Sequence, residues 1–109
     1  MSTNKEIITK IIIYINNNYK SIKNIDLLAQ KCGLTKKYFI TLFKQYTLET
    51  PHAYINQLRL IEGKKLLETT DLSITDIAKK IGFNSGNTFT KYFTKMIGVS
   101  PNIYRKGII

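Results

Sequence analysis

Residue types that build metal and disulfide sites are scarce in this sequence. Its 109 residues include one cysteine, Cys32, one histidine, His52, and no tryptophan. A single cysteine cannot form an internal disulfide, and one cysteine with one histidine supplies too few ligands for a structural zinc site. We therefore expect a reduced thiol at Cys32, no bound metal and no cofactor.

Long apolar runs are also missing. No stretch of about 18 apolar residues occurs, and a membrane span needs roughly that length. The N-terminal segment MSTNKEIITK contains an acid and lacks the apolar core and cleavage site of a signal peptide. We predict a cytoplasmic protein. The isoleucine triplet 11–13 could belong to a membrane-surface helix, but the asparagines at 16–18 and the few nearby basic residues favour packing in a core.

Acidic residues are few. Lysine and arginine together number 17 against 7 acids, which gives a formal net charge of +10. Such an excess favours a polyanionic partner, with nucleic acid ahead of a membrane surface, although a lysine-rich chain can simply be soluble. Only Arg59 and Arg105 are arginines. This matters because arginine reads guanine through two hydrogen bonds, whereas lysine binds phosphate as a point charge.

No arrangement of side chains indicates catalysis. Cys32 and His52 do not fall in a recognisable nucleophile pattern, and the acids form no evident pair. The sequence therefore predicts that the protein is not an enzyme, and we assign no catalytic residue. A small interaction or membrane-surface module is the remaining alternative class.

An internal repeat argues against that alternative. The segment IDLLAQKCGLTKKYFITLF (25–43) aligns with ITDIAKKIGFNSGNTFTKYF (74–93), and the second copy has one extra residue after its glycine. The match continues to Pro51 in the first copy and Pro101 in the second. A unit of about 50 residues is therefore duplicated.

Each copy is predicted to form a helix, a tight turn and a second helix. Asn24 and Ser73 are suitable N-caps, and Gly33 and Gly82 end the first helix of each copy. A small alanine lies where each pair of helices would cross, which permits a close approach. This is the helix-turn-helix geometry.

Three further helices complete the prediction. The helix at 5–17 is expected to pack on the first copy. The helix that starts at Pro51 has apolar residues, among them Ile61, on more than one face, as expected of a helix that bridges two cores. The sequence thus predicts an all-α chain of about seven helices: a first unit at 5–48, a linker helix at 51–68 and a second unit at 73–106.

The second helix of each copy, at about 35–46 and 85–97, has an apolar face and an outward face without acids. Helical spacing places Phe39, Leu42, Phe43 and Tyr46 inward in the first, and Phe89, Phe93, Met96 and Ile97 inward in the second. Asparagine can pair with adenine, threonine and isoleucine can touch a thymine methyl, and lysine can hold phosphate. The candidate DNA contacts are Lys36, Lys37, Ile40, Thr41, Lys44, Ser85, Gly86, Asn87, Thr90, Lys91 and Lys95; each also has an ordinary surface or core-rim reading.

The segment ITDIAKKIGFNSGNTFTKYFTKMIGVSPNIYR (74–105) fits the pattern I-x-x-I-A-x-x-x-G-F followed by F-x-x-x-F-x-x-x-x-G-x-x-P-x-x-Y-R. Over residues 5–106 the sequence resembles the DNA-binding domain of the AraC/XylS family. The resemblance implies two homeodomain-like three-helix units on one linker helix. It also implies a sequence-specific transcriptional regulator whose two recognition helices enter successive major-groove segments, about 34 Å apart.

The resemblance also suggests partners. Double-stranded DNA, bound by a monomer, is the main one, and nucleoid association would follow. In relatives the first unit can contact RNA polymerase, although no residue here can be assigned that role. No small-molecule effector domain fits outside the match, so the chain resembles the short stand-alone members; the alternative is a DNA-binding fragment of a larger ligand-responsive regulator. The target sequence, and activation against repression, stay open.

Three positions depart from the family pattern. Leu48 stands where the second copy has Gly98, so we expect a different turn there. Gly63 replaces an alanine of the linker helix, at a cost of about 1 kcal/mol in helix propensity, and we expect looser coupling of the units. Gly86 offers no side chain, which we expect to let the backbone approach DNA. With few arginines, base reading should lean toward A·T-rich sites.

Overall fold

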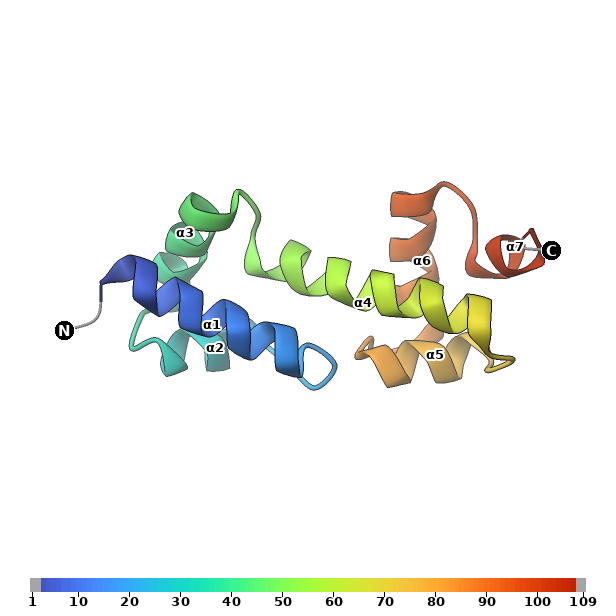
Figure 1. The fold of residues 1–109 in the computed structure, drawn as a ribbon, viewed down its shortest axis with the longest axis horizontal. Coiled ribbons are helices and arrows are strands. Elements are labelled where there is room, and N and C mark those ends of the chain that lie inside the picture. Colours follow the sequence, from blue (N-terminus) through green and yellow to red (C-terminus); the bar gives the residue numbers. More distant parts are fainter. Residues whose placement is uncertain (1–2, 108–109) are drawn as a thin grey trace. The chain divides into compact units, whose positions relative to one another are not determined.

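The computed structural model describes residues 3–107, and these form helices joined by short connections (Figure 1). No strand occurs among the described residues, so the prediction of an all-α chain of about seven helices is confirmed. The helices are α1 (Asn4–Asn18), α2 (Ile25–Lys31), α3 (Lys36–Thr47), α4 (Pro51–Thr69), α5 (Ile74–Ile81), α6 (Gly86–Ile97) and α7 (Pro101–Lys106).

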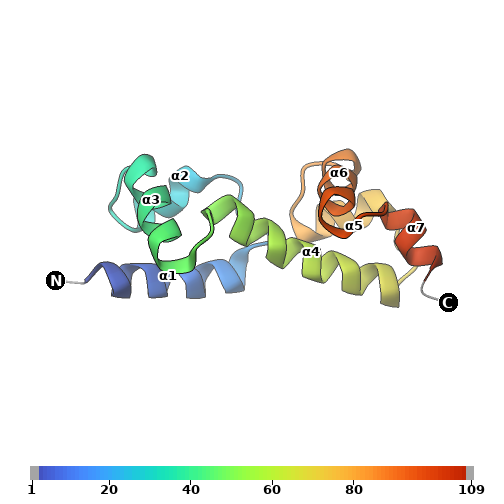
Figure 2. The same ribbon diagram turned by 90° about the horizontal axis from the view of Figure 1, so that it is seen from above.

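The chain divides into two compact units. The first ends at Leu58 and the second begins at Arg59, so the division falls inside α4. Within the first unit α3 packs on α1 and α2, and within the second α6 packs on α5 and α7 (Figure 2).

Each unit has a core of its own. The first contains Ile8, Ile11 and Ile15 of α1, Ile25, Leu28 and Ala29 of α2, Phe39, Leu42 and Phe43 of α3, and Ile55 of α4. The predicted packing of the first helix on this unit is therefore confirmed. The second contains Leu60, Leu67, Ile77, Ala78, Ile81, Phe83, Phe89 and Phe93. Because α4 supplies residues to both cores, the prediction of a helix with two buried faces is also confirmed.

Side-chain caps define where the helices begin. The side chain of Asn24 accepts a hydrogen bond from the Leu27 N–H, and that of Ser73 accepts one from the Asp76 N–H. Thr35, Ser85 and Ser100 cap α3, α6 and α7 in the same way. Each such cap contributes about 1 kcal/mol, which is substantial for helices this short.

Three apolar side chains expected to be buried are exposed. Tyr46 on α3, Met96 on α6 and Ile61 on α4 are 49%, 47% and 65% accessible. Tyr46 lies in the last turn of α3, beyond the residues of the first core, whereas Met96 precedes Ile97, which packs against the second core. Ile61 lies about 200° around the helix from Gly63, which faces the second core. Helical spacing identifies the apolar face of a helix. It does not show how far along the helix that face is buried by a neighbouring element.

Leu48 corrects another prediction. It adopts a left-handed conformation with φ 66°, and its N–H donates to the Lys44 carbonyl at 2.8 Å. Gly98 ends α6 with φ 96° and donates to the Thr94 carbonyl at 2.9 Å. The two helices therefore end in turns of the same kind, and the expected local difference is wrong.

Gly63 has a packing role that its sequence did not suggest. A Cβ atom at this position would lie 3.0 Å from two ring carbons of Phe89 and 3.1 Å from Cδ1 of Ile81. Glycine therefore lets α4 approach α5 and α6 closely within the second unit. The absence of a side chain that permits this contact also gives Gly63 its low helix propensity.

Candidate nucleic-acid interface

The turn between the paired helices is built alike in both units. Gly33 and Gly82 both have positive φ, at 69° and 107°. The next residue then donates its N–H back to the alanine at the helix crossing: Leu34 to Ala29 at 3.0 Å and Phe83 to Ala78 at 2.9 Å. This is a left-handed helix ending, in which glycine avoids the steric cost of positive φ. It fixes the direction in which α3 and α6 start.

Aromatic pairs hold the second helices from the other side. The Phe43 ring meets Tyr54 edge-on with centroids 5.6 Å apart, and the Phe93 ring meets Tyr104 edge-on at 5.4 Å. Tyr54 belongs to the start of α4 and Tyr104 to α7. Such pairs contribute roughly 0.5–1.5 kcal/mol beyond their buried area. Both α3 and α6 are thus held by a helix before them and a helix after them in the chain.

The predicted contact residues of α3 form an outward surface. Lys36, Lys37, Thr41 and Lys44 are exposed, and Ile40 packs partly against the first core. The Thr41 hydroxyl donates to the Lys37 carbonyl at 3.1 Å. Lys36 lies 3.8 Å from an Asp26 carboxylate oxygen, and both side chains are more than half exposed. A pair this exposed is weak and leaves the lysine available to a stronger anion.

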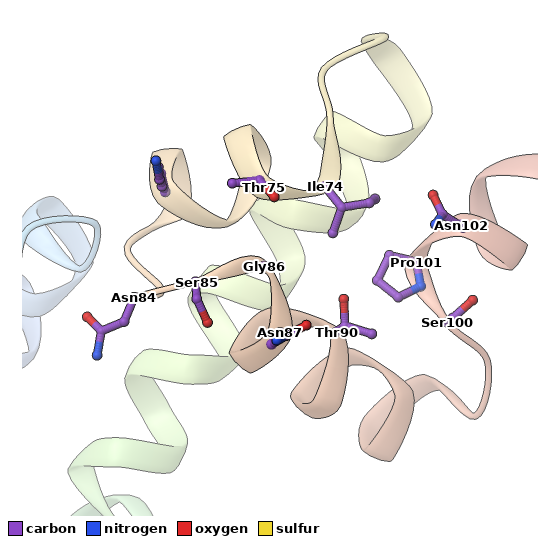
Figure 3. Close-up of a pocket in the computed structure, with 11 residues that line it drawn as sticks. Ile74, Thr75, Asn84, Ser85, Gly86, Asn87, Thr90, Ser100, Pro101 and Asn102 are labelled. Carbon is purple, nitrogen blue, oxygen red and sulfur yellow. The ribbon is translucent and has the colours of Figure 1, made fainter.

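On α6 the predicted residues divide into two sets. Lys91 and Lys95 are exposed, whereas Ser85, Gly86, Asn87 and Thr90 line one side of an open hollow (Figure 3). The Ser85 oxygen accepts the Thr88 N–H at 3.1 Å. Its hydroxyl is therefore already used to cap the helix.

Gly86 has a packing role that the sequence did not suggest. A Cβ atom there would lie 3.1 Å from the Thr75 hydroxyl oxygen and 3.4 Å from the Thr75 Cα. The missing side chain thus faces α5. Gly86 allows the two helices to approach each other, and its proximity to DNA stays a prediction.

The contacts of the two arginines, Arg59 and Arg105, were not predicted from the sequence. Arg105 on α7 donates to the carbonyls of Leu67, Leu72 and Thr70, at 3.2, 2.7 and 3.1 Å. It thereby satisfies carbonyls at the end of α4 and in the following loop. Arg59 lies over the Phe83 ring at 5.6 Å, and burial lowers the pKa of its guanidinium. The P-x-x-Y-R pattern contains Arg105 but does not reveal the three carbonyls that this residue contacts.

The charge of these surfaces suits a polyanion. Neither α3 nor α6 contains an acid, while together they carry five lysines. Between residues 3 and 107, no helix is both long and apolar enough to cross a membrane.

Comparisons with known proteins agree with this geometry. A family model described as a helix-turn-helix domain matches residues 28–107. The HTH-type transcriptional activator AarP of Providencia stuartii is 35% identical over 91% of this chain and 73% of its own. The regulatory protein SoxS of Escherichia coli (strain K12) is 34% identical over 94% of this chain and 96% of its own. The chain belongs to the AraC/XylS family.

Solved AraC/XylS-type structures share the fold. The C-terminal domain of AraT, a response regulator from Geobacillus stearothermophilus, superposes with a TM-score of 0.86 at 26% identity, covering 97% of this chain and 88% of that one. Other curated relatives are longer, and the chain spans 35% of one and 33% of another. The chain is a DNA-binding transcriptional regulator domain of the AraC/XylS family, as its residues predicted.

Proposed function

We propose that α3 and α6 are the recognition helices and that each enters a major-groove segment of the same duplex. The supporting observation is their shared construction: the same glycine turn before the helix, the same aromatic clamp after it, and an outward face without acids. In helix-turn-helix proteins the second helix reads base edges. The two faces carry different side chains, so they should read different sequences.

The chemistry of the exposed side chains on α3 and α6 suggests which part of the DNA each one contacts. Asn87 is exposed near the start of α6, where its amide can pair with adenine N6 and N7. Ile40 and Thr90 can contact thymine methyl groups, and Lys37 and Lys91 can reach phosphates or guanine. The remaining candidates lie on the same two helices or, for Ser85, at the N-cap of α6: Lys36, Thr41, Lys44, Ser85, Gly86 and Lys95. With no arginine on either helix, we propose a lean toward A·T-rich sites.

We further propose that one chain suffices for recognition and that no catalysis is involved. Two recognition helices on one polypeptide remove the usual need for a dimer to read two half-sites. RNA polymerase is a proposed second partner, because the similar protein AarP is named a transcriptional activator. Retention of polymerase on a DNA fragment only in the presence of this protein would support it.

The test is a selection of bound sequences from random duplex DNA with the purified protein. We expect two short conserved blocks about one helical turn apart, rich in A·T pairs, in a one-to-one complex. A strongly G·C-rich consensus would overturn the base assignment. Binding without any consensus, with affinity that falls steeply in salt, would reduce the function to phosphate contact alone.

An alternative organisation of the whole protein keeps the same proposed DNA contacts. The chain would then be the DNA-binding part of a larger ligand-responsive regulator, as its partial coverage of the longer relatives suggests. The DNA contacts of α3 and α6 are expected to be the same in both cases.

A further inference from the structure

The open hollow beside α6 is the feature that the candidate contacts leave unexplained. It has a volume of about 460 Å³ and is formed by α5, the start of α6 and the start of α7. Figure 3 shows Asn87 and Thr90 of α6 on one side, and Ser100, Pro101 and Asn102 on another. Thr75 and Lys79 of α5 complete the wall. All of these residues belong to the second unit.

The lining combines polar side chains with apolar surface and contains no acid. Among the described residues, no hydrogen bond or ion pair engages the side chains of Lys79, Asn87 or Asn102, so their donors are free for a ligand. Small-molecule sites are mostly enclosed, whereas this hollow is open to solvent. Its chemistry suits an extended anion that remains partly in solvent.

The position of the hollow identifies that anion. Asn87 and Thr90 belong both to the hollow and to the face of α6 proposed to read bases. A helix in the major groove is flanked by the sugar-phosphate strands, and these receive most protein–DNA hydrogen bonds. The strand on the Thr90 side of α6 would therefore run along the hollow.

We propose that the hollow holds the sugar-phosphate strand of the duplex read by α6, with Lys79 and Asn102 donating to its phosphates. The proposal rests on the proposed function. It adds a backbone-binding site made by α5 and α7, neither of which is a recognition helix. Lys79 and Asn102 would position α6 on the duplex without reading sequence.

The repeat indicates that this site is particular to the second unit. In the first copy Gln30 aligns with Lys79, and Asp26 aligns with Thr75. Asp26 is also the carboxylate that lies 3.8 Å from Lys36. The first unit therefore places a neutral side chain and an acid where the second has an ammonium group and a hydroxyl. The second unit would be the stronger phosphate anchor.

The salt dependence of duplex binding tests the role of Lys79. Each phosphate contact contributes about 0.9 to the slope of log affinity against log salt. We expect Lys79→Ala to flatten the slope by about that amount and to leave the selected consensus unchanged. Lys80→Ala is the matched control, because Lys80 is the exposed neighbour on α5 and does not line the hollow. Equal effects of the two variants, or no effect of Lys79→Ala, would overturn the proposal.

A second pair of variants tests Asn102. Asn102→Asp should weaken duplex binding by about tenfold at low salt, because a carboxylate would then face phosphates at close range. Asn17→Asp makes the same charge change at an exposed position of α1 and should have little effect. Thermal midpoints of all four variants check that each is folded. Equal affinities for Asn102→Asp and Asn17→Asp would reject the site.

These outcomes are separate from failure of the proposed function. If the wild-type protein selects no consensus, base reading by α3 and α6 fails, whatever the slopes are. If it selects a consensus but Lys79 and Asn102 behave as their controls do, only the strand site fails.

Discussion

Leu48 and Gly98 end α3 and α6 in the same left-handed conformation, although only one of them is a glycine. A left-handed conformation costs a non-glycine residue roughly 1–2 kcal/mol. The Leu48 side chain is 84% exposed, so burial does not compensate for this strain. Leu48 therefore stores strain at the end of α3.

Replacing Leu48 with glycine should stabilise the protein. Part of the relieved strain is offset by the greater freedom of glycine in the unfolded chain, so we expect a net gain of about 0.5–1 kcal/mol in the free energy of unfolding. Urea unfolding followed by circular dichroism measures it. Gly98→Ala is the reverse control and should lose about 1 kcal/mol or more. A less stable Leu48→Gly protein would show that the Leu48 side chain makes a stabilising contact.

Arg105 is expected to be essential to the second unit. Arg105→Ala leaves the carbonyls of Leu67, Thr70 and Leu72 without their shared donor. Hydrogen bonds from a charged group contribute about 1.5–3 kcal/mol each, and they are not independent here, so we expect a loss of about 3 kcal/mol. Thermal unfolding measures the loss.

Two further variants sharpen the Arg105 prediction. Arg105→Lys should recover only part of the stability, because an ammonium group cannot reach three carbonyls as the planar guanidinium does. Lys106→Ala, at the exposed neighbour, should change stability by less than about 0.5 kcal/mol. If Arg105→Lys is as stable as the wild type, charge matters more than geometry.

Gly63→Ala tests the close approach of α4 within the second unit. Alanine should add about 1 kcal/mol of helix propensity. Its Cβ would meet the Phe89 ring at 3.0 Å, and that ring is itself packed 5.6 Å from both Phe83 and Phe93. We therefore expect no net stabilisation.

A double-mutant cycle separates the two effects at Gly63. In a Phe89→Leu background the ring is gone, so Gly63→Ala should be more favourable than in the wild type by about 1 kcal/mol. Identical effects in the two backgrounds would place the constraint elsewhere, for example at Ile81.

Asn87 and Lys37 should each control one block of the selected DNA sequence. Asn87→Ala removes the proposed adenine contact and should reduce discrimination at one position of the α6 block by about 1–3 kcal/mol. Lys37→Ala should affect only the α3 block. Repeating the selection with each variant, and with Lys10→Ala on the exposed surface of α1 as a control, measures this. Loss of both blocks in a single variant would contradict separate reading.

Much of this fold could be read from residue spacing. The duplicated glycines, the capping residues Asn24 and Ser73, and the apolar spacing around Phe39 and Phe89 predicted helices that the structure contains. These signals are local, since each depends on residues within one or two turns of a helix. The base-contact residues also came from spacing, and they stay a prediction.

What the sequence did not reveal depends on contacts between distant segments. The role of Gly63 is set by Phe89, and that of Arg105 by carbonyls more than thirty residues earlier in the chain. Tyr46 lies on the predicted face yet beyond the end of the core. The spacing of residues along the chain shows neither which distant residue a side chain will contact nor where the core ends.

The paired contacts of Phe43 with Tyr54 and Phe93 with Tyr104 bear on how such a protein can be recombined. They make the first turns of α4 the counterpart of α7, so the linker helix is also the closing helix of the first unit. A chimera that exchanges the first unit at residue 48, where α3 ends, would separate Phe43 from its ring partner and from Ile55. Modules with interchangeable DNA specificity should instead be joined within α4, after Leu58.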